Sequence, residues 1–412
     1  MRRASSLRLL AGVAAASLVL AACASNGSAG QGGSSTPEQT QSTSQAAPPE
    51  TSDMGGGQSS SGTTPSGESS AEGSGAGSSA SGPAMTGDKS KVKMGLAYDL
   101  GGRGDQSFND SAARGFDKAK ADGVAVAGEL TAEKDEPDSA KVNRLNQLVK
   151  DGATDIVAVG FAYATALGQV APKNPNVHFA IVDDASLCTS KADGGAVDKP
   201  LPNVDCMTFA AEQGSFLVGV AAALETKSNK VGFIGGVDVP LIQTFQAGFD
   251  AGVKAANPDA TISDKYITEP PDFGGFNDPA SGEKIADGMY DGGIDIIYAA
   301  AGGSGAGVFK SAKAAGKLGI GVDSDQYNSP SLANVKDVIM TSMVKNVDVA
   351  VYDFFAAAVN GAPLTGVQTY DLKSGGIGYS TSGGAIDKIV PQLEEYKQKI
   401  ISGEIKVPTT LG

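Results

Sequence analysis

The chain has 412 residues, of which 41% are hydrophobic and 19% charged, a composition that allows two ordinary domains with apolar cores. The formal net charge of −14 disfavours contact with nucleic-acid phosphates, so we expect no nucleic-acid partner. One histidine, His178, and three cysteines are too few for most zinc sites, Ser/His/Asp triads and Cys/His nucleophile pairs, so we expect no metal, no cofactor and no catalytic residue.

The N-terminus has the pattern of an export signal. Arg2, Arg3 and Arg8 precede an apolar run over residues 9–22, and this run is too short to serve as a stop-transfer helix. Small residues lead into Cys23, as in the lipobox of bacterial lipoproteins, and the alternative is ordinary signal cleavage at an A-x-A-like site. We expect residues 1–22 to be a signal peptide, and lipidated Cys23 to hold an exported protein on the outer face of the cytoplasmic membrane.

Residues 23–90 are predicted to form a disordered linker that begins at the lipidated cysteine. Residues 24–90 contain Gly, Ser, Thr, Ala, Pro and Gln with a few charges, but no Val, Ile, Leu, Phe or Tyr. Such a segment cannot bury enough apolar surface to offset the entropy lost on folding. As a flexible coil it would span roughly 45 Å, so we expect the folded part of the chain to be held on a tether.

Cys188 and Cys206 flank residues 189–205, a polar stretch that is typical of a surface loop. An exported protein meets an oxidising environment, in which two such cysteines can be joined. A disulfide here would stabilise the fold by about 3 kcal/mol. The alternative is two unpaired buried thiols, and we favour the disulfide.

From residue 91 onward, short apolar runs alternate with amphipathic segments. The runs expected to form strands are residues 92–97, 155–159, 177–182, 230–234, 295–299, 319–322 and 338–341, and residues 111–121 and 212–226 are expected to form helices. Nearly continuous apolar strands joined by helices indicate parallel sheets that are covered on both faces. So many elements exceed one sheet, and the sequence therefore predicts an α/β fold of two doubly wound lobes that divide near Thr208.

Polar residues gather at the predicted strand ends, where doubly wound folds bind their ligands. Asp99, Asp183 and Asp323 each follow a strand, and Lys345 follows the last one. Each aspartate could instead cap a helix or shape a turn. His178 lies inside a predicted strand, and we interpret it as a structural residue rather than a base.

Aromatic residues and glycines also occur in these loops. Phe108 and Phe276 stand among Gly, Ser, Asn and Asp rather than in apolar runs, so they are candidates for ligand contacts, and the alternative is a minor role in the core. Phe161 and Tyr163, after another strand, are weaker candidates for pocket walls. The glycine-rich residues 302–307 lack the Gly-Lys-Ser/Thr ending of a Walker A loop, and are expected to present backbone N–H groups to an oxygen-bearing ligand.

Residues 95–115 contain Asp99, a Gly-Gly pair and an Asp-x-Ser-Phe-Asn sequence, and they resemble the opening signature of the basic membrane protein family. The members of that family are purine-nucleoside-receptor lipoproteins that serve as substrate-binding components of ABC transporters. Residues 210–217, 274–282 and 299–309 are similar to the family in the same order. The similarity runs from residue 91 to about residue 360 and is therefore specific to the family.

The resemblance implies a type I periplasmic-binding-protein fold, in which two α/β lobes joined by a three-crossing hinge close on a nucleoside. Residues 91–208 with about 345–378 would form the N-terminal lobe, and residues 209–344 with about 379–412 the C-terminal lobe. The residues that the resemblance places at the ligand are Phe108 and Phe276 on the two faces of the purine, Asp323 at the ribose hydroxyls, Asp99 and Asp183 at the base or sugar edge, and Lys345, Gly302, Gly303, Ser107 and Asn109 in the remaining polar shell.

This ligand suits the chemistry of the candidate residues. Stacking on aromatic rings supplies about 1–3 kcal/mol per base, and a carboxylate accepts hydrogen bonds from vicinal hydroxyls. Lys345 is the only cation among the candidates, so a neutral nucleoside is favoured over a nucleotide. We therefore expect a monomeric, non-enzymatic, lipid-anchored protein that captures a nucleoside, with a purine favoured, and delivers it to ABC permease subunits. The alternatives are the same fold with a sugar or another small neutral ligand, a nucleoside hydrolase, and an adhesive surface protein.

Overall fold

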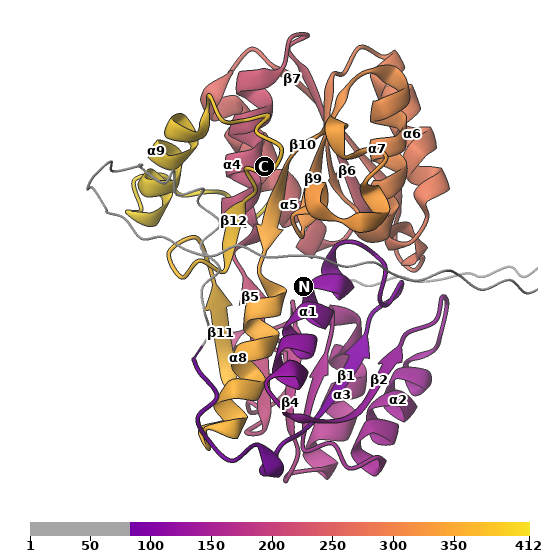
Figure 1. Cartoon of the computed structure of the whole chain (residues 1–412), viewed down its shortest axis with the longest axis vertical. Coiled ribbons are helices and arrows are strands. Elements are labelled where there is room, and N and C mark those ends of the chain that lie inside the picture. Colours follow the sequence, from indigo (N-terminus) through magenta and orange to yellow (C-terminus); the bar gives the residue numbers. More distant parts are fainter. Residues whose placement is uncertain (1–82) are drawn as a thin grey trace, which may run out of the picture. The chain divides into compact units, whose positions relative to one another are not determined.

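A computed structural model describes residues 83–412, which form two α/β lobes that each surround a six-stranded sheet (Figure 1). The predicted signal peptide, Cys23 and most of the predicted linker lie outside the described residues. None of the helices between residues 83 and 412 combines the length and the apolarity needed to cross a bilayer. The predicted α/β fold with two parallel-sheet lobes is confirmed.

The first lobe contains a parallel sheet in the order β11-β5-β4-β3-β1-β2. Its strands are β1 (Lys93–Tyr98), β2 (Ala125–Thr131), β3 (Asp155–Ala158), β4 (His178–Val182), β5 (Val204–Phe209) and β11 (Gly366–Tyr370). Its helices are α1 (Phe108–Ala121), α2 (Asp138–Lys150), α3 (Ala164–Val170) and α8 (Val347–Val359). Helices α1 and α8 pack on one face of the sheet and α2 and α3 on the other, which explains why the central strands are apolar throughout.

The second lobe has the sheet order β12-β10-β9-β8-β6-β7, parallel except for β12, which pairs antiparallel with β10. Its strands are β6 (Lys230–Val237), β7 (Thr261–Thr268), β8 (Ile296–Ala300), β9 (Leu318–Asp323), β10 (Ile339–Lys345) and β12 (Ile377–Tyr379). Its helices are α4 (Ala211–Glu225), α5 (Pro240–Ala256), α6 (Pro279–Asp291), α7 (Gly305–Ala315) and α9 (Val390–Ile401). Helices α4, α5 and α9 cover one face of this sheet, and α6 and α7 cover the other.

The chain crosses between the lobes three times, between β5 and α4, between β10 and α8, and between β11 and β12. These crossings lie at the β11–β5 edge of the first sheet and at the β12–β10 edge of the second, so one side of the molecule forms the hinge. Phe209 and Tyr370, at the ends of two crossing strands, stack with ring centroids 5.0 Å apart. Strands β2 and β7 lie at the opposite edges, farthest from the hinge.

Five strands, β2, β5, β7, β11 and β12, were not predicted from the sequence. The edge strands β2 and β7 carry half-exposed polar residues such as Glu129 and Asp264, so their sequences lack a continuous apolar run. Strand β5 contains Asp205 and Cys206, and it begins within the stretch that the sequence predicted to be a polar loop. The structure pairs Cys206 with Cys188 in a disulfide that closes this loop.

The predicted linker extends too far at its C-terminal end, because residues 83–90 already lie against the first lobe. The side-chain oxygen of Asn360, just after α8, accepts hydrogen bonds from the backbone N–H groups of Thr86 (2.9 Å) and Gly87 (3.0 Å). The Asn360 amide in turn donates to the carbonyl of Ala84 (3.0 Å), and Met85 packs on the core beneath. Composition did not reveal this attachment, because one methionine and backbone hydrogen bonds are sufficient for it.

Asp205 on β5 is fully buried, and neither of its carboxylate oxygens meets a hydrogen-bond donor among residues 83–412. Burial raises its pKa to about 7. The carboxyl is therefore protonated in the folded protein and ionised in the unfolded chain between about pH 5 and pH 7. In that window folding takes up a proton, and stability falls as the pH rises.

We expect Asp205→Asn to remove this component, which amounts to about 1 kcal/mol of unfolding free energy per pH unit between about pH 5 and pH 7. Urea unfolding of wild type and variant across this range measures the two slopes. The other buried carboxyls contribute equally to both proteins, so the difference isolates Asp205. The exposed Asp198→Asn serves as a control that leaves the slope unchanged, and parallel slopes for wild type and Asp205→Asn would contradict the prediction.

Candidate functional site

A cavity lies between the two lobes, at the carboxyl ends of the parallel strands. It contains about 600 Å³ of space between protein atoms, counted out to its mouth. Eight of the ten predicted ligand residues line it: Asp99, Phe108, Asn109, Asp183, Phe276, Gly302, Asp323 and Lys345. Both lobes therefore contribute to one site, as the strand-end positions of these residues predict.

Asp99 lies at the end of β1 and accepts a hydrogen bond from the backbone N–H of Leu100 (2.8 Å). The surrounding protein withholds water from the carboxyl and raises its pKa to about 6, while the charge of Lys141 acts in the opposite direction. The side chain of Asn109 is fully engaged here, since it accepts from the backbone N–H of Asp99 (3.0 Å) and donates to the carbonyl of Leu100 (3.1 Å). Asn109 therefore shapes the turn that presents Asp99.

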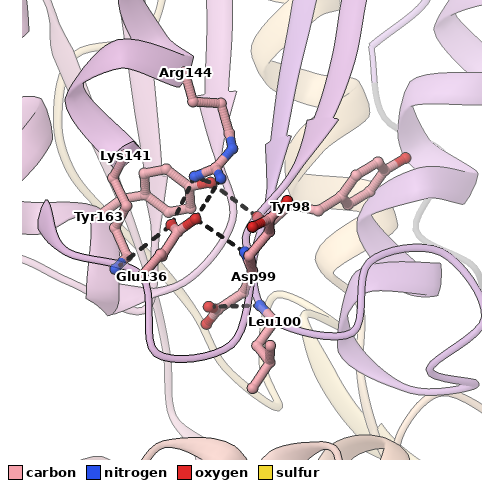
Figure 2. Close-up of polar contacts among 8 residues, drawn as sticks. Tyr98, Asp99, Leu100, Glu136, Lys141, Arg144 and Tyr163 are labelled. Carbon is pink, nitrogen blue, oxygen red and sulfur yellow. Dashed lines mark hydrogen bonds and ion pairs between the residues drawn. The ribbon is translucent and has the colours of Figure 1, made fainter. Parts of the chain in front are cut away.

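A network of ion pairs and hydrogen bonds among neighbouring side chains holds the end of β1 in place (Figure 2). Arg144 donates to Glu136 (2.8 Å) and to the hydroxyl of Tyr163 (3.0 Å), and this hydroxyl donates to the carbonyl of Tyr98 (2.9 Å). Tyr163 is fully buried and does not line the cavity, so the prediction that it is a pocket wall was wrong. Its role is to fix the strand end from which Asp99 projects.

Asp183, at the end of β4, forms a buried ion pair with Lys345 at the end of β10. Their side chains are only 4% and 2% exposed, so the two charges depend on each other for solvation. The Lys345 ammonium also lies 4.6 Å from the centroid of the Phe108 ring, a cation–π distance. This pair connects the first sheet to the hinge end of the second.

Asp323, at the end of β9, is 6% exposed and accepts a hydrogen bond from the Ser107 hydroxyl (2.6 Å). Burial raises the pKa of Asp323, and the neighbouring Lys345 charge and the Ser107 hydrogen bond oppose that rise. Ser107 belongs to the first lobe and does not line the cavity, so it positions Asp323 rather than facing a ligand. Gly303, also outside the lining, lies beside the backbone of Phe276.

Asp183 and Asp323 both have left-handed backbone conformations, with φ of 67° and 62°. Such angles are uncommon in residues other than glycine, although aspartate adopts them more readily than most, and they cluster at functional sites where the surrounding structure imposes them. The turn at each strand end directs the carboxylate toward the other lobe. Two independent strand ends thus carry the same strained arrangement at one cavity.

The rest of the cavity wall is mainly apolar, and most of it was not predicted. The first turns of α5 contribute Leu241, Ile242 and Phe245, and Phe161, a weaker candidate in the sequence, also lines the cavity. The α5 residues have the sequence pattern of helix residues that face a core, so nothing in the sequence marked them as part of a ligand site. Asp105 was also missed; it caps the start of α1 by accepting from the backbone N–H groups of residues 107, 109 and 110.

Sequence and structure comparisons identify relatives of this chain. The family model described as "ABC transporter substrate-binding protein PnrA-like" matches residues 91–410. The CD4+ T-cell-stimulating antigen of Listeria monocytogenes is 38% identical over 76% of this chain and 87% of its own. The ABC transporter nucleoside-binding protein BmpA of Lactococcus lactis is 33% identical over 78% of this chain and 90% of its own.

A crystal structure of an ABC transporter solute-binding protein from Aeropyrum pernix superposes with a TM-score of 0.64. It is 28% identical, and the match covers 77% of this chain and 94% of that protein. The type I arrangement of two hinged α/β lobes predicted from the resemblance is confirmed. The family model, the curated relatives and the solved structure agree with one another, and the chain belongs to the Bmp family of ABC transporter substrate-binding proteins.

Proposed function

We propose that the cavity binds a nucleoside, with a purine base favoured. The observation that carries this proposal is that Phe108 and Phe276, from opposite lobes, line the same cavity as the three strand-end carboxylates. Two aromatic rings on opposite walls suit a flat heterocycle, which offers a π face to each. The carboxylates suit the hydroxyl groups of a sugar, because ionised oxygens accept strong hydrogen bonds from them.

The charge of the site favours a neutral ligand. Among the described residues that line the cavity, Lys345 is the one cation, and it is already paired with Asp183. A phosphate group would meet Asp99 and Asp323 without an arginine or a second lysine to balance it. A nucleoside therefore suits the site better than a nucleotide, and the name of the Lactococcus lactis relative, a nucleoside-binding protein, supports the same choice.

We also propose that the protein delivers its ligand to an ABC transporter at the outer face of the membrane. The N-terminal sequence supports export and lipid attachment at Cys23, so the folded lobes would work outside the cytoplasmic membrane. Closure of the lobes around a nucleoside would present one face to ABC permease subunits, and binding would occur without turnover. We propose a monomer in this role.

Native mass spectrometry of the purified protein, followed by calorimetric titration with inosine, guanosine and adenosine, tests the ligand class. We expect a 1:1 complex with a purine nucleoside and no release of free base. Binding of free sugars with no binding of nucleosides would replace the proposal with a sugar-binding function. Release of free base during incubation would indicate a hydrolase.

Asp323→Asn is expected to weaken inosine binding by about tenfold, because a charge-assisted hydrogen bond to a sugar hydroxyl is worth roughly 1.5 kcal/mol or more. Binding of the free base hypoxanthine should change little, since it has no ribose. Calorimetric titration of both ligands measures the difference. The exposed Asp337→Asn is the control, and an equal loss for the base and the nucleoside would show that Asp323 does not address the sugar.

A further inference from the structure

The two loops farthest from the hinge approach each other across the cavity mouth. Residues 132–137 follow β2, and residues 269–277 follow β7; both strands are the edge strands opposite the three crossings (Figure 1). When hinged lobes open, the points farthest from the hinge separate most. Contacts between these two loops are therefore lost early when the lobes open. Such contacts stabilise the closed state relative to the open one.

One contact of the loop after β7 is aromatic, and its first-lobe partner follows the central strand β3 rather than the edge strand β2. Phe161 of the first lobe and Phe273 of the second have ring centroids 6.0 Å apart and an interplanar angle of 60°, a favourable geometry for an aromatic pair. Phe161 lines the cavity, whereas Phe273 does not and is 37% exposed. Phe273 therefore covers Phe161 from the solvent side. Such exposure of a large apolar side chain is rare among the described residues, where only Val367 and Leu411 share it.

A second contact lies beside the first. The side chain of Lys134 reaches the turn of the other lobe, where its Nζ lies 3.1 Å from the position that a Cβ on Gly274 would occupy. Asp272 and Asp278 flank this glycine, and hydrogen bonds from Ser281 lower the pKa of Asp278, with a smaller contribution from the Lys134 charge. A side chain at position 274 would displace the lysine. The glycine thus leaves room for a cation from the opposite lobe next to two carboxylates.

Each contact is fixed by the structure around it. The Lys134 loop is closed by Glu136, which accepts from the backbone N–H of Glu133 (2.9 Å) and is held by Arg144 in the network of Figure 2. On the other side, the carbonyl of Phe273 accepts from the backbone N–H of Phe276. Phe273 at the mouth and Phe276 in the cavity wall therefore belong to one short turn.

We propose that Phe161, Phe273 and Lys134, with the space left by Gly274, form an inter-lobe latch that sets how long the closed state lasts. The latch rests on the proposed ligand-binding function, since it controls release from that same cavity. Because Phe273 and Phe276 share a turn, closing the latch also brings the Phe276 ring to its place in the cavity wall. The latch residues govern the dissociation rate, whereas the strand-end carboxylates govern recognition.

The test compares Phe273→Ala and Lys134→Ala with Val367→Ala, which removes an equally exposed apolar side chain far from the mouth. Each full-length protein carries dyes at Asn146→Cys on α2 and Lys284→Cys on α6, both exposed, and single-molecule energy transfer reports the lobe separation with and without inosine. Stopped-flow dilution of the inosine complex gives the dissociation rate. We expect Phe273→Ala to increase the open population and to accelerate release about three- to tenfold, with association unchanged and Val367→Ala like wild type.

The outcomes separate the latch from the function beneath it. If wild type binds inosine but Phe273→Ala changes neither the open population nor the dissociation rate, the latch is overturned and the binding function stands. If inosine does not bind at all, the proposed function fails, and the separation measured without ligand still decides the latch: an unchanged distribution in Phe273→Ala overturns it, and a shift toward larger separations supports it. A slower association with unchanged dissociation also overturns it.

Discussion

Replacing Phe276 with alanine is expected to weaken binding of a purine nucleoside by roughly ten- to hundredfold, because one stacked face contributes about 1–3 kcal/mol. Phe276 lines the cavity from the second lobe, and its ring lies against the backbone of Gly236 on β6, which holds it in place. The alanine variant leaves the carboxylates and Lys345 untouched. Calorimetric titration with guanosine measures the loss, and Phe108→Ala should give a comparable one from the opposite wall.

The same titration with ribose separates stacking from general damage to the site. Ribose has no aromatic face, so its weaker binding should be nearly unchanged in Phe276→Ala. A surface variant, Leu411→Ala, removes an exposed apolar side chain elsewhere and is expected to bind both ligands as wild type does. Equal losses for guanosine and ribose in Phe276→Ala would contradict the stacking role.

Lys345→Met is expected to destabilise the protein by about 3–5 kcal/mol, because it leaves the buried carboxylate of Asp183 without its counter-charge. The same change removes a positive charge that lowers the pKa of Asp323, so a second buried carboxyl becomes harder to ionise. Chemical unfolding measures the change in unfolding free energy. Methionine keeps most of the lysine's volume, so the charge and not the packing is tested.

A matched control is the exposed pair of Lys399 and Glu395 on α9, where Lys399→Met should cost less than about 1 kcal/mol. The double variant Lys345→Met/Asp183→Leu should recover a large part of the lost stability, since it removes both charges from the interior. If Lys345→Met unfolds at the same denaturant concentration as wild type, the pair does not depend on mutual solvation as the structure indicates.

The strand-end rule accounts for what the sequence could predict about the site. Asp99, Asp183 and Asp323 follow apolar strands directly, and the carboxyl ends of parallel strands converge, so their meeting at one cavity follows from local pattern and fold class together. Lys345 was found in the same way. For each of these residues, the apolar run directly before it in the sequence is enough to predict its position at a strand end.

The residues that were missed depend on contacts distant in sequence. Phe245 reaches the cavity only because α5 packs on the second sheet, and nothing in its helical pattern differs from that of a core residue. Ser107 was placed at the ligand, but its hydroxyl bonds to Asp323 from 216 positions away. Tyr163 was placed at the cavity wall, but it bonds to the backbone of Tyr98 in the neighbouring strand. Strand pairing and lobe closure decide such roles.

The attachment of residues 83–90 beside Asn360 has a mechanical consequence. The chain that precedes residue 83 enters the fold through the first lobe, on the end of α8 and away from the second sheet. With an anchor at Cys23, any pull from the membrane would be borne by the first lobe, which would act as the stationary arm. The second lobe, which carries Phe276, Asp323 and Phe273, would then move relative to the first lobe without displacing the linker.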